Sequence, residues 1–318
     1  MPLRRAHLVS SISAAITLSL ASGCQQPAPQ IHPTSHPAAS TQATRDTTGG
    51  DRDARLEKLR RAEIQSLLDE ALSAPAMDQR TAAALAAADR ATGDVADTFR
   101  AISAARDLLV EDLRNVDTTA YKATRARVGG DGKLIATLDL SQGSLEATDR
   151  SLDVAIQGEG FFKVQMPGSS PMAIGYTRNG NFFVNQKGEL VLALGDGYRL
   201  LPPITVPTDA TDISISIGLD GTLQYTRAGT NIKQTAGLIQ LAIFPNPCAL
   251  RWLGGCLYIP TKTSGSPVDT LPGEHGAGQV LGGFLEASNV EVFREAARMR
   301  FLLEWRASLL RAINKPAP

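Results

Sequence analysis

Two stretches near the ends of the chain carry apolar residues at alternating spacings of three and four. Apolar residues at these spacings line one side of a helix, as in a coiled coil. One arginine takes a position in each series, Arg106 and Arg306, and we expect both to reach the edge of the apolar stripe. The apolar positions are Val95, Phe99, Ile102, Leu109, Leu113 and Val116 in the first series, and Val292, Ala296, Met299, Leu303, Leu310 and Ile313 in the second.

A single amphipathic helix cannot bury its own stripe. The two predicted helices therefore pack together, pack with neighbouring subunits or lie on the central domain, and the sequence leaves these alternatives open. A further, charged helix is predicted within 52–77, where "SAPAM" ends the pattern at Pro75.

Between the terminal helices the pattern changes to short alternating segments bounded by turn residues. Asn179-Gly180 and Asp220-Gly221 are two-residue hairpin signals, and "NQKGE" at 185–189 is another turn. The middle of the chain, 128–283, is therefore predicted to be all-β. The expected fold class is α+β, with terminal helices forming a coiled-coil-like pair around a mainly-β central domain of short antiparallel strands.

The N-terminus has the pattern of an export signal. Arg4 and Arg5 precede the apolar run "LVSSISAAITLSL", and "LASGC" then resembles the bacterial lipobox that ends at a lipidated cysteine, here Cys24. The following residues, 24–51, are rich in Pro, Gln, Ser, Thr and Ala, which cannot bury a core. We expect a signal peptide over 1–23, a lipid on Cys24 and a polar tether, with an ordinary signal peptide as the alternative.

Composition narrows the function further. The chain has 32 basic and 32 acidic residues, which gives no support for a nucleic-acid surface. Cys248 and Cys256 flank Gly254-Gly255, and they form either a disulfide or two buried thiols. The four histidines form no pair at metal-ligand spacing.

Sequence motifs of catalysis are missing. There is no Gly-x-Ser-x-Gly elbow, P-loop or HExxH. We predict no catalytic residue, cofactor, metal or small-molecule substrate, and hence no enzyme. A periplasmic enzyme or glycan-binding β protein stays as a distant alternative, because a pair of catalytic carboxylates cannot be recognised at this level.

Five short motifs follow one another in an order known from one family. They are "NVDTTAYK" at 115–122, "LDVAIQGEGFF" at 152–162, "YTRNGNF" at 176–182, "FPNPCAL" at 244–250 and "GFLEASNVEV" at 283–292. These motifs resemble those of bacterial flagellar basal-body rod and hook proteins, and are nearest to the distal-rod type. The chain departs from the family pattern at Asp112, Arg114 and Ala120. It also adds an export signal and an extra helix.

The resemblance implies a structural subunit of the flagellar rod whose terminal helices line a tube and whose β domain lies outside. It divides the chain into 52–77 (extra helix), 78–127 (rod-type helix and joint), 128–283 (β domain) and 284–318 (rod-type helix). The residues it implicates in assembly or the joint are Val95, Phe99, Ile102, Leu109, Leu113, Asn115, Asp117, Thr118, Thr119, Tyr121, Lys122, Ser288, Asn289, Val292, Met299 and Leu303.

The implied partners are copies of this chain, other rod, hook or ring proteins, and a membrane through the lipid. The implied location is the periplasmic basal body. Gln25 after Cys24 favours the outer membrane over the inner one. An alternative is a rod-derived lipoprotein that binds the rod or its rings without polymerising.

Overall fold

A computed structural model describes residues 58–66, 68–69, 94–167, 173–194, 197–207, 215–227 and 232–314. The chain divides into two compact units. The helical unit contains the residues up to Leu113, 127–135 and those from Val292 onward, and the sheet unit contains 114–126 and 136–291. The predicted signal peptide and tether, with Cys24, lie outside the described residues.

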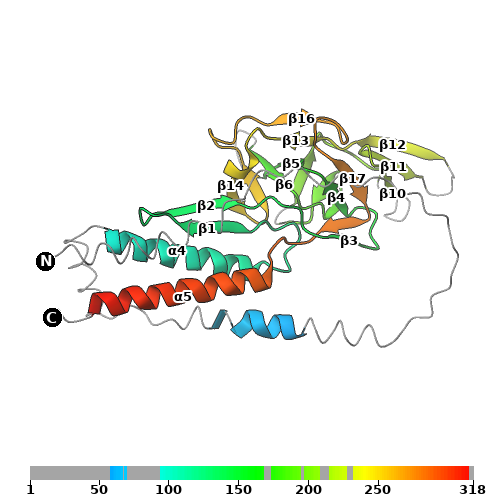
Figure 1. The fold of residues 1–318 in the computed structure, drawn as a ribbon. Coiled ribbons are helices and arrows are strands. Elements are labelled where there is room, and N and C mark those ends of the chain that lie inside the picture. The colour runs from blue at the N-terminus through cyan, green and yellow to red at the C-terminus, as the bar shows by residue number, and fades with distance from the viewer. Residues whose placement is uncertain are drawn as a thin grey trace, which may run out of the picture. The chain divides into compact units, whose positions relative to one another are not determined.

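Two long helices dominate the helical unit, α4 (Asp94–Arg114) and α5 (Val292–Asn314). They run side by side in opposite directions (Figure 1), with Ala96 and Phe99 packed against Leu310. The Arg306 guanidinium lies over the Phe99 ring, 5.2 Å from its centroid. Among the described residues, no helix has the length and apolarity to cross a membrane.

The predicted apolar stripe of α4 is mostly buried. Phe99, Ile102, Leu109 and Leu113 are at most 6% exposed. On α5, Val292, Ala296 and Met299 are also buried. Further along α5 the buried positions are Leu302, Trp305 and Leu309, whereas Leu303 is half-buried. The buried side of α5 is therefore rotated from the predicted one. Arg106 on α4 and Arg306 on α5 are both half-buried, as expected for residues at the edge of an apolar stripe.

The sheet unit is built from short strands, and the pairings between its described strands are antiparallel. This confirms the mainly-β middle. Its largest sheet has nine strands in the order β14-β15-β6-β5-β9-β8-β7, with β13 joined to β5 and β16 to β13. A second sheet has the order β10-β11-β12, and β17-β4 and β18-β3 are two-stranded.

The strands have the following bounds. They are β1 (Thr124–Val128), β2 (Leu134–Leu138), β3 (Leu145–Ala147), β4 (Val154–Gln157), β5 (Phe161–Gln165), β6 (Ile174–Thr177), β7 (Phe182–Val184), β8 (Leu190–Leu192), β9 (Tyr198–Leu201), β10 (Ile215–Ile217), β11 (Thr222–Thr226), β12 (Lys233–Leu238), β13 (Leu241–Ile243), β14 (Arg251–Gly254), β15 (Leu257–Ile259), β16 (Val268–Thr270), β17 (Gln279–Gly282) and β18 (Phe284–Glu286).

Two of the three predicted turns join paired strands. Asp220-Gly221 connects β10 to β11, and 185–189 connects β7 to β8. The predicted hairpin at Asn179-Gly180 is wrong, because β6 pairs with β5 and β15 rather than with β7. Gly180 is instead required by a close approach, since a Cβ there would lie 1.7 Å from the Val154 carbonyl oxygen.

The described residues test the predicted helical segments in part. Residues 58–66 and 68–69 of the predicted extra helix are helical. The predicted C-terminal helical segment from 284 begins instead with β18, which pairs with β3, and α5 starts at Val292. The alternating apolar pattern therefore located the helix, whereas the motif at 283–292 is strand and loop up to Val292, where α5 begins.

Candidate functional site

The site lies where the chain enters the sheet unit after α4 and where it leaves it before α5. The entering segment, 115–123, is a compact turn. The Thr118 amide donates to the Asn115 carbonyl at 3.1 Å, and the Tyr121 amide donates to the Thr118 carbonyl at 3.1 Å. The Thr118 hydroxyl also donates to Asn115 Oδ1 at 3.1 Å. Two backbone bonds and one bond between side chains therefore close the turn directly after α4.

Ala120 has an unusual backbone within this turn. Its φ is +56°, in the left-handed region, and its side chain is fully buried. Its amide donates to the Glu286 carbonyl at 2.7 Å. A side chain with a Cβ is strained at such a φ, so this bond ties the turn to the leaving segment at some conformational cost.

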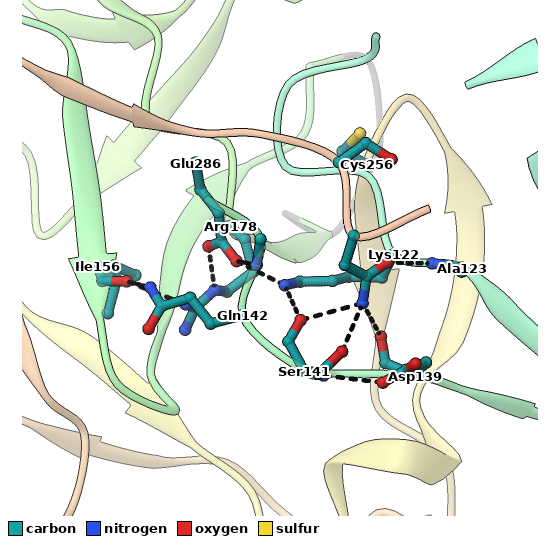
Figure 2. A network of polar contacts seen from close by, with 12 residues as sticks. Lys122, Ala123, Asp139, Ser141, Gln142, Ile156, Arg178, Cys256 and Glu286 are labelled. Carbon is teal, nitrogen blue, oxygen red and sulfur yellow. Dashed lines mark hydrogen bonds and ion pairs between the residues drawn. The ribbon is translucent and has the colours of Figure 1, made fainter. Parts of the chain in front are cut away.

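Lys122 extends from the entering segment into the interior. Its Nζ donates to Glu286 Oε1 at 2.5 Å and to the Ser141 carbonyl at 2.8 Å (Figure 2). The side chains of Lys122 and Glu286 are 0% exposed. A buried ion pair is stable only when its remaining hydrogen-bonding capacity is also satisfied, and the partners of Glu286 meet that condition.

Arg178 is the second cation on Glu286, held there from the segment that follows β6. Its Nε donates to Glu286 Oε2 at 2.9 Å. Its Nη1 donates to the carbonyls of Gly158 and Gly160, both at 2.6 Å, and its Nη2 to the Ile156 carbonyl at 3.0 Å. The Gly143 amide adds a bond of 3.0 Å to Glu286 Oε1. We call Lys122, Arg178 and Glu286 the crossing triad.

Asn289 completes the closure between entering and leaving segments. Its Oδ1 accepts from the Ala123 amide at 2.8 Å, and its Nδ2 donates to the carbonyls of Asp139 and Ser141 at 2.7 and 3.0 Å. The Asn289 amide donates to the Tyr121 carbonyl at 3.3 Å. One amide side chain therefore links three separate stretches of backbone.

The charges of the triad shift one another's ionisation. Burial lowers the pKa of Lys122, and the neighbouring Arg178 acts in the same direction, against the attraction of Glu286. Burial alone would raise the pKa of Glu286, but Arg178 and Lys122 more than offset it, so that pKa lies below its ordinary value. Glu286 is therefore the ionised centre on which both cations depend.

Cys256 lies beside the same turn. Its Sγ donates to the Thr119 carbonyl at 3.3 Å, and burial raises the pKa of this thiol to about 11. Because Cys256 is a free, buried thiol, the predicted alternative of a disulfide between Cys248 and Cys256 is wrong. The Tyr121 ring meets the Trp252 ring edge-on, with centroids 6.4 Å apart.

The structure separates the predicted assembly residues into two groups. Val95, Phe99, Ile102, Leu109, Leu113, Val292, Met299 and Leu303 belong to the helical unit, whereas Asn115, Asp117, Thr118, Thr119, Tyr121, Lys122, Ser288 and Asn289 belong to the sheet unit. In the second group Tyr121, Lys122 and Asn289 are buried, and Asp117 is exposed.

Arg178 and Glu286 were missed as site residues. A charged residue next to buried apolar strand positions, in "YTRNG" and "GFLEAS", was the available signal. Within the described part of the chain, no group of three or more His, Cys, Asp or Glu side chains could hold a metal ion.

Comparisons with known proteins agree with the motifs. Residues 155–225 match the family model described as the flagellar hook protein FlgE/F/G D1 domain. The chain is 38% identical over 198 residues to the flagellar basal-body rod protein FlgG of Buchnera aphidicola subsp. Schizaphis graminum, covering 61% of this chain and 74% of that protein. It is 40% identical over 173 residues to FlgG of Caulobacter vibrioides, covering 54% and 63%.

A more distant relative has a different name within the same group. The flagellar basal-body rod protein FlgF of Salmonella typhimurium is 29% identical over 199 residues, covering 57% of this chain and 75% of that protein. The motifs, the D1 match and the extent of the FlgG similarity lead to one conclusion: the chain belongs to the family of flagellar basal-body rod proteins.

Proposed function

We propose that this chain is a structural, non-enzymatic subunit of a bacterial flagellar basal-body rod, of the distal type, that assembles with copies of itself and other flagellar components. Its similarity to proteins named as flagellar rod proteins supports this role. The observation that carries the proposal is the crossing triad. Its three side chains come from three of the family motifs and are at most 4% exposed.

Side chains buried to this degree are not accessible to a ligand, and their role is therefore to stabilise the fold. Lys122 lies on the entering segment and Glu286 on the leaving one, and their ion pair closes a separation of 164 positions along the chain. Breaking such a pair by removing one partner is strongly destabilising. The triad therefore ties the two crossings of the chain together, which a subunit needs if both terminal helices are to take part in one assembly.

We also propose that α4 and α5 form the coiled-coil-like pair through which the subunit assembles. The contact of Phe99 with Leu310 and Arg306 supports it, as does the three-and-four spacing of buried positions on α4.

A lipid on Cys24 and a periplasmic location, with the outer membrane favoured, belong to the same proposal and rest on the sequence. The alternative is a rod-derived lipoprotein that binds the rod or its rings without polymerising. The anchor favours this alternative, because a lipid-tethered chain could not easily pass through the flagellar export channel.

Localisation of the labelled protein in purified basal bodies tests the proposed function. Signal along the rod, in many copies, is expected for a polymerising subunit. Signal confined to the rod surface or the rings selects the alternative, and absence from basal bodies contradicts both. Cys24→Ser is expected to move the protein from the membrane to the soluble periplasmic fraction, whereas unchanged membrane partition would refute the lipid anchor.

A further inference from the structure

Tyr258 carries a buried hydroxyl group that the contacts of the crossing triad do not account for. The residue lies in β15 and is 0% exposed. Its ring packs in an apolar cluster, where the Phe161 ring meets it edge-on at a centroid distance of 6.2 Å. Within the described part of the chain, its hydroxyl oxygen has no hydrogen-bond partner. Such a group is rare in folded proteins, because folding has removed its bonds to water without replacing them.

The Tyr258 hydroxyl faces the crossing triad. Burial raises its pKa most, and the neighbouring Cys256 and Glu286 act in the same direction. Arg178 and the backbone amide of Lys122 act in the opposite direction. The amide is close enough to act on the hydroxyl, but its geometry falls short of a hydrogen bond. The hydroxyl therefore lies beside the polar groups of the triad, although its ring is surrounded by apolar side chains.

The triad itself has hydrogen-bonding capacity to spare. An ammonium group has three N–H donors, and among the described residues Lys122 Nζ uses two of them, on Glu286 Oε1 and the Ser141 carbonyl. Glu286 Oε2 accepts from Arg178 Nε, and a carboxylate oxygen can accept a second bond. The cluster also holds two positive charges against one negative charge, so a further dipole beside it is favourable.

We propose that one ordered internal water molecule links the Tyr258 hydroxyl to the crossing triad. Water both donates and accepts, so one molecule can bond the hydroxyl, the third N–H of Lys122 and the second lone pair of Glu286 Oε2. Buried waters typically make about three such bonds to polar groups that lack another partner. The water ties β15 to the entering and leaving segments. The inference concerns the fold of the sheet unit and does not depend on the proposed function.

The sign of the effect of Tyr258→Phe tests this link in the full-length chain. The variant keeps the ring and loses only the hydroxyl. We expect its melting temperature to fall by about 2–4 °C, the shift for loss of one hydrogen bond in a domain of this size. Tyr225→Phe is the matched control and should show a similar loss, because the Tyr225 hydroxyl donates directly to Gln234 at 2.7 Å. An unchanged or raised melting temperature in Tyr258→Phe would overturn the proposal, since removal of an unsatisfied hydroxyl costs nothing.

A high-resolution crystal structure of the wild-type chain identifies the bridging group. We expect density for one water within hydrogen-bonding distance of Tyr258 Oη and of Lys122 Nζ or Glu286 Oε2. The same density should be lost or displaced in crystals of Tyr258→Phe. A direct bond between the Tyr258 hydroxyl and a protein group, or no ordered density beside the hydroxyl, would overturn the proposal even if the variant is less stable.

Discussion

The crossing region consists of the entering segment, 115–123, together with Arg178, Glu286 and Asn289. It and the helix pair are stabilised by opposite kinds of contact. In the first, Lys122 and Arg178 share one buried carboxylate, and the polar atoms of Glu286 and Asn289 are bonded within the same unit. In the second, apolar side chains are buried on one side of each helix while Phe293 and Phe301 stay exposed on another. The side chains of the crossing triad and of Asn289 are bonded within one chain, whereas α5 keeps exposed apolar surface.

This difference in packing suggests separate roles for residues that the family resemblance implicates together in assembly. We propose that the crossing residues stabilise the folded monomer and that the exposed sides of the helices carry assembly.

Loss of the shared carboxylate should have the largest effect. Glu286→Gln leaves Lys122 and Arg178 buried without a counter-charge, and removing one partner of a buried ion pair costs about 3–5 kcal/mol. Urea unfolding measures the loss. Glu146→Gln is the control, since this exposed residue is in the partner strand β3, opposite Leu285, and it should change stability little. Equal stability of the two variants would show that the triad is not a stabilising network.

Disruption of the apolar stripe of α4 should have the next largest effect on stability. Leu109 is 2% exposed in α4, and Leu109→Ala should cost about 2–5 kcal/mol through lost burial and a cavity. The neighbouring Leu108 is half-buried, so Leu108→Ala should cost clearly less. Thermal unfolding followed by helix content compares the two. If they were equally mild, the stripe would not be packed in the monomer.

Acid should weaken the sheet unit through the same carboxylate. The pKa of Glu286 is lowered in the folded chain, mainly because Arg178 and Lys122 outweigh its burial. Its contribution is therefore present above the ordinary glutamate pKa and is lost as pH falls through the lowered value. Stability measured from pH 7 downward should decline less steeply in Glu286→Gln. Parallel profiles for wild type and variant would contradict the assignment of the acid effect to Glu286.

The smallest effect concerns backbone strain in the turn. Ala120 has a φ of +56°, and a left-handed residue with a Cβ costs about 1–2 kcal/mol. Ala120→Gly relieves that strain but loosens the unfolded chain, so we expect a net gain of at most about 1 kcal/mol. Ala123→Gly, at a buried position without positive φ, should instead destabilise. A loss in both variants would mean that the packing of the Ala120 methyl group outweighs its strain.

The sequence was informative where structure is local. Spacings of three and four located α4 and α5, and alternation with turn residues predicted the short antiparallel strands. It failed where one residue serves a distant partner. Gly180 looked like a hairpin turn, but its small size accommodates the Val154 carbonyl of another strand.

The candidate site shows the same limit. Lys122 and Asn289 could be selected from motifs. The pairing of Lys122 with Glu286 could not be predicted, because it spans 164 positions and hydrophobic periodicity indicates only local structure. Arg178 lies within "YTRNGNF", and no local pattern in this motif indicates the partner of the arginine. The rotation of the buried side of α5 from Leu303 toward Leu302 and Trp305 could not be read either, because both choices fit a three-and-four spacing.

The most direct test of the central claim compares Lys122→Met with Phe301→Asp for melting temperature and for incorporation into purified basal bodies. Lys122→Met should lower the melting temperature by several degrees and still be incorporated at temperatures where the chain is folded. Phe301→Asp should leave the melting temperature close to that of wild type and abolish incorporation. The opposite pattern, with Lys122→Met stable but excluded and Phe301→Asp incorporated normally, would contradict the assignment of folding to the crossing region and assembly to the helices.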